Sequence, residues 1–291
     1  MKYQNKEGWL FVAPLLCWLA FSICVPLYIA IELSFFDIKI IGTEGKFVGF
    51  KNYIKTLNSS KFPKALTNSI YWVLANAVTQ TFFAFLIALT LNKHFKGVKI
   101  ATNWIILSFI IPTVVIVVIW KLMLSSSSGI INSLLVQLHI IDKPIGFFSS
   151  STSAFVSLVL INSWRWSPFL ALIILSGLKS IHQEIYDASK IDGASFFAEF
   201  FQITLPQLKG VLFVLGLVGT LLSFNVFDII WLITKGGPSS ATTTLPLLIY
   251  ETAFTKFRLS QAAALSVITS FILLTFSIVF IKVMGKDHDE R

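Results

Sequence analysis

Long apolar runs alternate with short polar stretches along the whole chain. Six of these runs are close to the length of about 20 apolar residues that a helix needs to cross the hydrocarbon core of a bilayer. They cover residues 9–35, 69–91, 103–123, 154–178, 211–234 and 262–283. Backbone groups cannot stay unpaired in lipid, so each run is expected to be helical. The pattern predicts an all-α integral membrane protein with six transmembrane helices, in which residues 1–291 form a single transmembrane domain.

The composition agrees with a membrane protein. Hydrophobic residues make up 55% of the chain, charged residues only 13%, and the mean hydropathy is +0.80. A soluble domain of this length carries about a quarter charged residues. The net charge of +9 does not indicate a nucleic-acid partner, because the lysines lie in loops between apolar runs, where lipid headgroups account for them. The run that follows Lys2 and Lys6 is too long for the apolar segment of a signal peptide, so we interpret it as the first span.

Cysteine and histidine residues predict no disulfide and no metal site. Cys17 and Cys24 lie in one apolar run, and on a helix their Cα atoms would be about 10 Å apart, beyond disulfide reach. The four histidines show no ligand spacing; they are His94, His139, His182 and His288. The sequence contains no Walker A motif and no room for a nucleotide-binding domain. We therefore expect no cofactor on this chain.

The segment 179–210 between the fourth and fifth runs is charged and helical in pattern. Asp192-Gly193 interrupts it, an apolar stripe begins at Phe196, and Pro206 is expected to end or kink the second piece. This predicts two short helices joined by a turn, suited to dock into a groove on another protein. The pattern alone fits equally well an amphipathic hairpin that lies on the membrane surface.

The residues of this segment resemble the signature of ABC importer permeases, which runs Glu-Ala-Ala, then Gly, then Ile-x-Leu-Pro. Here it reads Asp187-Ala188-Ser189, Gly193 and Ile203-Thr204-Leu205-Pro206, with every spacing kept. Asp and Ser replace Glu and Ala, and His182 stands where the family often has Pro. In that family the loop is cytoplasmic and docks into the ATPase subunit. The resemblance implies ATPase coupling by Glu184, Asp187, Ala188, Ser189, Asp192, Gly193, Ala194, Ile203, Leu205 and Pro206.

The resemblance covers nearly the whole chain. Within the family, the chain is similar to the carbohydrate-uptake class, in a compact six-span form of the maltose-transporter larger-subunit type. It is carried by segments 49–53, 68–69, 129–135, 164–169, 177–178, 228–238, 242–244 and 250–254. It implies a permease subunit of an ATP-driven importer for a sugar or oligosaccharide, or for a related polyol such as glycerol phosphate. The implied partners are a second permease in a heterodimer, two ATPase subunits that carry ATP-Mg, an extracytoplasmic sugar-binding protein and the lipid bilayer. The implied location is the cytoplasmic membrane of a bacterium or archaeon.

The overall count of charged residues does not decide on which side of the membrane the two termini lie. Six spans would place both termini on one side, but Lys and Arg are divided almost evenly between the two sides. The short loop 92–101 carries Lys93, Lys96 and Lys99, and short loops weigh most in the positive-inside rule. Together with the resemblance, this predicts cytoplasmic termini.

Several strongly polar residues fall within the apolar runs, where such side chains usually face the protein interior or a water-filled path. The substrate-path candidates are Asn162, Trp164, Arg165, Asn225, Asp228 and Trp231. Asn225 and Asp228 are three apart and would share one helix face, as would Asn162 and Arg165. Indole rings stack on sugars, and amides and carboxylates bind hydroxyls. Equally, the polar groups can hold helices together, Trp favours the membrane interface, and Arg165 and Asp228 can simply pair.

Two other functions compete with an importer subunit. An ion-driven secondary transporter would show inverted repeats and charged residues paired at the membrane midplane. Only Arg165 and Asp228 are candidates for such a pair. A membrane-embedded enzyme would need a convergent catalytic set, and no run carries one at helical spacing.

Overall fold

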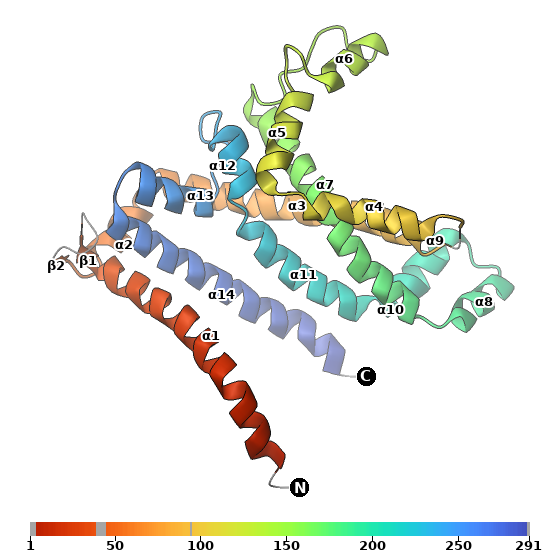
Figure 1. Ribbon diagram of the computed structural model, residues 1–291, viewed down its shortest axis with the longest axis horizontal. Helices are drawn as coiled ribbons and strands as arrows, with labels where there is room; N and C mark the ends of the chain where they lie inside the picture. Colours follow the sequence, from red (N-terminus) through yellow and green to blue (C-terminus); the bar gives the residue numbers. More distant parts are fainter. Residues whose placement is uncertain (1–3, 39–44, 94, 290–291) are drawn as a thin grey trace. The chain divides into compact units, whose positions relative to one another are not determined.

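The computed structural model describes residues 4–38, 45–93 and 95–289 (Figure 1). The chain divides into two compact units, one formed by Met1–Pro63 with Leu248–Leu274 and the other by Lys64–Leu247 with Thr275–Arg291. Two helices, α3 (Lys61–Leu91) and α14 (Leu259–Asp289), contribute to both. Each unit is described separately below.

The first unit contains α1 (Gln4–Phe35), β1 (Phe36–Asp37), β2 (Lys46–Phe47), α2 (Lys51–Leu57), η2 (Glu251–Thr255) and the first part of α14. The antiparallel β1–β2 pair, with Phe36 opposite Phe47, is a small addition to the predicted all-α fold. Asn52 donates hydrogen bonds to the carbonyls of Ser34 and Phe36, both at 2.9 Å, and the Tyr53 hydroxyl lies 2.6 Å from Ser34 Oγ. These bonds fix α2 against the end of α1.

The second unit contains most of α3 and the remaining helices. In chain order these are α4 (Val98–Ile110), α5 (Thr113–Met123), α6 (Ile130–Gln137), α7 (Ser151–Ser180), α8 (Gln183–Ile191), α9 (Phe196–Glu199), η1 (Phe200–Thr204), α10 (Leu205–Gln207), α11 (Lys209–Phe224), α12 (Asp228–Thr234) and α13 (Leu245–Tyr250), the last of which extends into the first unit.

Five helical stretches of the described chain are long and apolar enough to cross a membrane. They are Phe11–Phe35, Lys61–Leu91, Ser151–Ser180, Lys209–Thr234 and Leu259–Val283. They match five of the six predicted spans, with the second beginning eight residues earlier than expected. This confirms a multi-span, mainly helical membrane protein.

The third predicted span, 103–123, is wrong as a single helix. The structure has α4 and α5 there, separated by Ile111 and Pro112 in extended conformation, with ψ angles of 130° and 139°. Proline lacks the N–H of the helical ladder, and its ring disfavours helical geometry in the preceding residue. The apolar pattern continues through the break, so hydropathy alone did not reveal it.

The fifth predicted span, 211–234, is also interrupted. Residues 225–227 separate α11 from α12, and the Asn225 side chain donates to the Leu221 carbonyl at 2.8 Å. Asn and Asp compete with helices by such local bonds. The prediction that Asn225 and Asp228 share one helix face is therefore wrong, because no continuous helix joins them.

Two apolar cores lie along α3 and α7 in the second unit. The first core includes Trp72 of α3 and Leu158 of α7, together with side chains of α5 and α12. Helices α5 and α12 lie side by side (Figure 1). The second core includes Ala84 of α3 and Ile174 of α7, together with side chains of α4 and α11. Polar residues of α3 and α7, among them Asn76, Gln80 and Asn162, occupy the sequence between the two cores.

Candidate functional site

The segment of residues 183–208, here called the hairpin segment, contains the predicted two helices and turn. α8 ends at Ile191, and Gly193 follows in left-handed geometry with φ +74°. The Gly193 N–H bonds the Lys190 carbonyl at 3.1 Å, and the Ala194 N–H bonds the Ser189 carbonyl at 3.0 Å. This is a Schellman helix end, and it explains why glycine suits this position. A Cβ atom on residue 193 would meet nothing within 4 Å, so the requirement is for backbone angle and not for space.

Two hydroxyl contacts close the hairpin segment on itself. The buried Ser189 hydroxyl lies 2.9 Å from the Tyr186 carbonyl and 3.4 Å from Glu199 Oε2, which joins α8 to α9. The Tyr186 hydroxyl lies 3.2 Å from Thr204 Oγ1, which joins α8 to η1. Ser195 caps α9 by accepting the Ala198 N–H. The two short helices therefore form one bonded unit.

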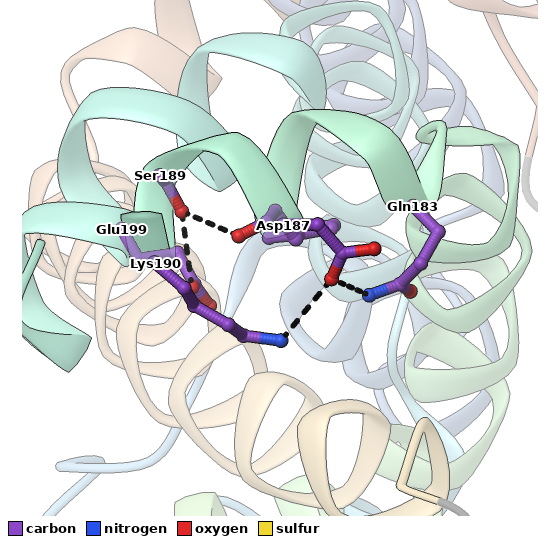
Figure 2. Close-up of polar contacts among 6 residues, drawn as sticks. Gln183, Asp187, Ser189, Lys190 and Glu199 are labelled. Atoms are coloured by element: carbon purple, nitrogen blue, oxygen red, sulfur yellow. Dashed lines mark hydrogen bonds and ion pairs between the residues drawn. The ribbon is translucent and has the colours of Figure 1, made fainter. Parts of the chain in front are cut away.

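Asp187 lies on the outer face of α8, where Figure 2 shows its carboxylate between Gln183 and Lys190. The Gln183 amide donates to Asp187 at 3.2 Å, and Lys190 Nζ is 3.6 Å away. The Asp187 side chain is still 59% exposed. Its carboxylate is held in place by its own helix and remains accessible to a binding partner.

The tip of the hairpin segment exposes large apolar side chains. Ile191 is 87% exposed, Phe196 61%, Phe197 70% and Phe201 59%. Phe200, by contrast, packs edge-on against Phe85 of α3 with ring centroids 5.5 Å apart. The predicted apolar stripe is therefore divided, with one ring anchoring the hairpin segment to α3 and three left uncovered.

The remaining predicted residues lie along the same segment. Glu184, Ala188, Asp192 and Pro206 are exposed, whereas Ala194, Ile203 and Leu205 are half-buried. Pro206 was predicted to end or kink the second piece. It lies inside the short α10, which ends at Gln207, and the preceding turn is a π-helix, η1, in which the Leu205 N–H bonds the Phe200 carbonyl. Because Pro206 has no N–H to donate, a widened turn before it is a natural accommodation.

A buried amide network joins α3 to α7 between the two cores. Asn76 Oδ1 accepts hydrogen bonds from Asn162 Nδ2 at 2.7 Å and from Gln80 Nε2 at 2.9 Å, and Thr79 Oγ1 lies 2.6 Å from Ser163 Oγ. Asn76 and Asn162 are both 0% exposed. Asn162 therefore joins two helices in this structure and does not line an open path.

Arg165 and Asp228 form an ion pair at the same level. Arg165 Nη1 lies 3.2 Å from Asp228 Oδ2, and Asp228 Oδ1 accepts the Ile229 N–H at 2.9 Å. The Arg165 side chain is 17% exposed and the Asp228 side chain 43%. The buried Arg165 Nε has no partner among the residues that the structure describes. The pair thus keeps one donor and part of one carboxylate unused.

The predicted tryptophans surround this level without converging on one point. Trp231 stacks on Phe227 and receives Lys235 Nζ over its ring at 5.8 Å. Trp164 packs edge-on against Trp120 and lines a mainly apolar cavity of about 680 Å³ beside the break at 111–112.

The loop of residues 235–244 is held to α3 by side-chain hydrogen bonds. Asn68 donates to the carbonyls of Ser240 and Thr243, both at 3.0 Å, and Ser69 Oγ accepts the Leu245 N–H. Gly236 has φ +85°, and a Cβ there would overlap Thr243 Oγ1. Thr242 Oγ1 also donates to the Gly237 carbonyl at 2.9 Å, and the Thr-rich run 242–244 was the signal in the sequence that this loop is bonded internally.

These observations can be compared with known proteins. The sequence model of the family described as "Binding-protein-dependent transport system inner membrane component" matches residues 80–284. The chain belongs to this family. It is thus a multi-pass membrane component of a binding-protein-dependent transport system, and residues 183–208 lie inside the matched region.

Relatives of this permease component match over nearly their full length. The trehalose/maltose transport system permease protein MalF of Thermococcus litoralis is 34% identical, with 97% of this chain and 95% of that protein covered. The lactose transport system permease protein LacF of Rhizobium radiobacter is 29% identical, with 97% and 94% covered. A crystal structure of a bacterial ABC transporter involved in the import of the acidic polysaccharide alginate superimposes with a TM-score of 0.82 over 97% of each chain, at 21% identity. That structure supports the ABC importer permease fold.

Proposed function

We propose that this chain is the membrane-spanning permease subunit of an ATP-driven, binding-protein-dependent importer of a sugar or oligosaccharide. It forms half of the translocation pathway, paired with a second permease subunit in the cytoplasmic membrane of a bacterium or archaeon. Both termini and the hairpin segment face the cytoplasm. An extracytoplasmic binding protein delivers the sugar from the other side.

The observation that carries the proposal is the construction of the hairpin segment. It is bonded internally at Ser189 and Tyr186, yet it exposes the Asp187 carboxylate and four apolar side chains. Exposed apolar groups beside charge are typical of a protein-binding surface. A separate ATPase subunit is the proposed partner, and ATP-Mg is bound and hydrolysed there.

A movement of the ATPase would reach the membrane helices through the same contacts. Phe200 anchors the hairpin segment to Phe85 of α3, and Leu208, only 1% exposed, belongs to the second core. Close-packed interiors transmit displacement and absorb little of it. A push on the tip would therefore shift α3 and α11 and change access to the polar residues that lie between the two cores.

The substrate path is proposed to run beside the Arg165–Asp228 pair. The pair offers hydrogen-bond donors and acceptors with no net charge, which suits the hydroxyls of a neutral sugar better than a phosphate. Trp164, Trp231 and Asn225 contribute stacking surface and an amide nearby, while Asn162 supports the path from behind. The named substrates of the relatives, trehalose, maltose and lactose, agree with a neutral sugar.

The experiment that tests the function is a mild-detergent purification of the tagged chain from native membranes, using wild type and three variants. A second permease and a Walker A ATPase should co-purify with wild type and with Asp187→Glu. Asp187→Asn should recover about tenfold less ATPase, since a hydrogen bond to a charged group contributes about 1.5 kcal/mol or more. Asp142→Asn, which alters an exposed carboxylate outside the hairpin segment, serves as the control.

Recovery of the chain alone, or only as a homo-oligomer, would contradict the proposal and favour the ion-driven transporter. Uptake by proteoliposomes separates the two directly. An importer accumulates sugar only with ATP and binding protein present, whereas an ion-driven transporter needs a gradient and neither of these.

A further inference from the structure

A polar cavity in the first unit gathers three cationic side chains. It measures about 310 Å³ and lies where α2 ends, α3 begins, and η2 leads into α14. The cations that line it are Lys61, Lys256 and Arg258. Glu251 Oε2 lies 3.7 Å from Lys256 Nζ and is the one carboxylate paired with them among the described residues. The cavity therefore carries an excess of positive charge.

The charge crowding is evident at Lys256. Burial and the nearby Lys61 ammonium hold the pKa of Lys256 below its ordinary value, and Glu251 offsets this only in part. Like charges that are brought together without a counter-charge raise the free energy of the folded protein. The arrangement is costly in the empty cavity and would be relieved by a bound anion.

A second, independent feature of the cavity also indicates a ligand. Thr56 is only 3% exposed and lines the cavity, yet its Oγ1 makes no hydrogen bond to any described residue. Buried hydroxyls are normally satisfied by protein or by bound groups. Ser59 and Ser60 line the cavity beside it. Hydroxyl donors next to Lys and Arg are the chemistry that binds phosphate oxygens.

The position of the cavity suggests where the phosphate comes from. Lys61 and Leu259 are the first residues of two apolar membrane spans, so the cavity lies at headgroup depth. Phe254 and Phe257, which flank Lys256 in sequence, are 63% and 74% exposed, a pattern typical of residues at the lipid interface. In the six-span topology proposed above, the segments that line the cavity follow the first and fifth spans and therefore lie on the extracytoplasmic side of the bilayer.

We propose that this cavity binds the phosphate group of an anionic lipid headgroup, in the extracytoplasmic leaflet of the proposed topology. Lys61, Lys256 and Arg258 neutralise the phosphate, and the Thr56 hydroxyl donates to one of its oxygens. The volume is at the lower limit of ordinary ligand sites, which fits a headgroup. The proposal is independent of which sugar is transported and of how the ATPase docks.

The test measures lipid binding to the purified full transporter by native mass spectrometry, with phosphatidylglycerol against phosphatidylcholine. Wild type should prefer phosphatidylglycerol, and the Lys256→Gln/Arg258→Gln double variant should bind it about tenfold more weakly, as expected for the loss of charged hydrogen bonds. Lys256→Arg should bind like wild type. Lys55→Gln, on the exposed surface of α2 and outside the cavity, is the matched control.

Thr56→Val keeps the shape of the side chain and removes a hydroxyl that bonds nothing in the described chain. It should weaken phosphatidylglycerol binding severalfold without lowering the melting temperature, so a loss of binding by misfolding is separated from a loss of a ligand contact.

Three outcomes would overturn the lipid assignment. Equal weakening in the double variant and in Lys55→Gln would show that binding is spread over the surface and does not involve the cavity. Stabilisation of wild type by millimolar inorganic phosphate, lost in the double variant and unmatched by lipid, would assign the site to a soluble phosphate. Loss of binding-protein affinity in the double variant, with lipid binding intact, would make the cavity a contact for an acidic protein surface.

Discussion

Replacing Gly193 tests two explanations of why a glycine follows α8. Either the turn needs a left-handed backbone angle, or a partner protein packs directly on the glycine Cα. The left-handed conformation at φ +74° costs an ordinary L-residue about 1–2 kcal/mol, less for Asn and more for a β-branched residue. No atom lies within 4 Å of a Cβ placed there, so size within the chain itself adds nothing. Such a cost changes the ratio of formed to unformed turn by a factor of about 5–30. Coupling should therefore decrease in the order Gly, Asn, Ala, Val.

The assay is binding-protein-stimulated ATP hydrolysis by the reconstituted complex, with the amount of assembled complex measured for each variant. Asn should keep at least half of the wild-type stimulation, and Val should lose most of it while still inserting into the membrane. If Asn and Ala are as inactive as Val, the partner must pack directly on the glycine Cα, and the argument from backbone conformation is refuted.

Three further predictions concern other parts of the chain. The Arg165→Gln/Asp228→Asn double variant should lose less stability than the sum of the losses in the two single variants, with a coupling energy of about 1–3 kcal/mol in thermal unfolding. Additive losses would show that the pair contributes nothing to stability. Gly236→Ala should destabilise the chain by about 2 kcal/mol or more, because the left-handed angle and an overlap with Thr243 add together, and an unchanged melting temperature would contradict this. In lipid-free detergent, Lys256→Gln should raise the melting temperature at neutral pH. Its pKa is held below 10.5 by burial and Lys61, so protonation opposes folding below the folded-state pKa, and the difference should shrink as pH rises towards 10.5; a difference that does not vary with pH would exclude this cause.

The approximate positions of five of the six predicted membrane helices could be read from the sequence because hydropathy reports length and burial in lipid directly. The two breaks could not be predicted from it. Pro112 was visible, but proline is common in membrane helices and does not always interrupt them. At residues 225–227 the interruption depends on local side-chain bonds, such as that of Asn225 to the Leu221 carbonyl, which an apolar average does not register.

The hairpin segment was predictable because its turn needs a residue that accepts left-handed geometry, and Gly193 marks that turn in the sequence. The role of Asn162 was not predictable. A buried amide that binds a substrate and one that joins two helices look the same in sequence, and only the 2.7 Å bond to Asn76, 86 residues earlier, distinguishes them here. The cationic cavity could not be predicted either, since Lys61 and Lys256 lie far apart along the chain and come together only in the folded structure.

The two apolar cores of the second unit constrain how this protein can change in length. α3 and α7 run unbroken from one core to the other, so the residues between Trp72 and Ala84, and between Leu158 and Ile174, act as fixed spacers. A single inserted residue would turn one end of such a helix by about 100° against the other and point one core face away from its neighbours. At the breaks 111–112 and 225–227 no continuous helix couples the rotation of one side to that of the other. Insertions and deletions among relatives should therefore collect at the breaks and avoid the two spacers.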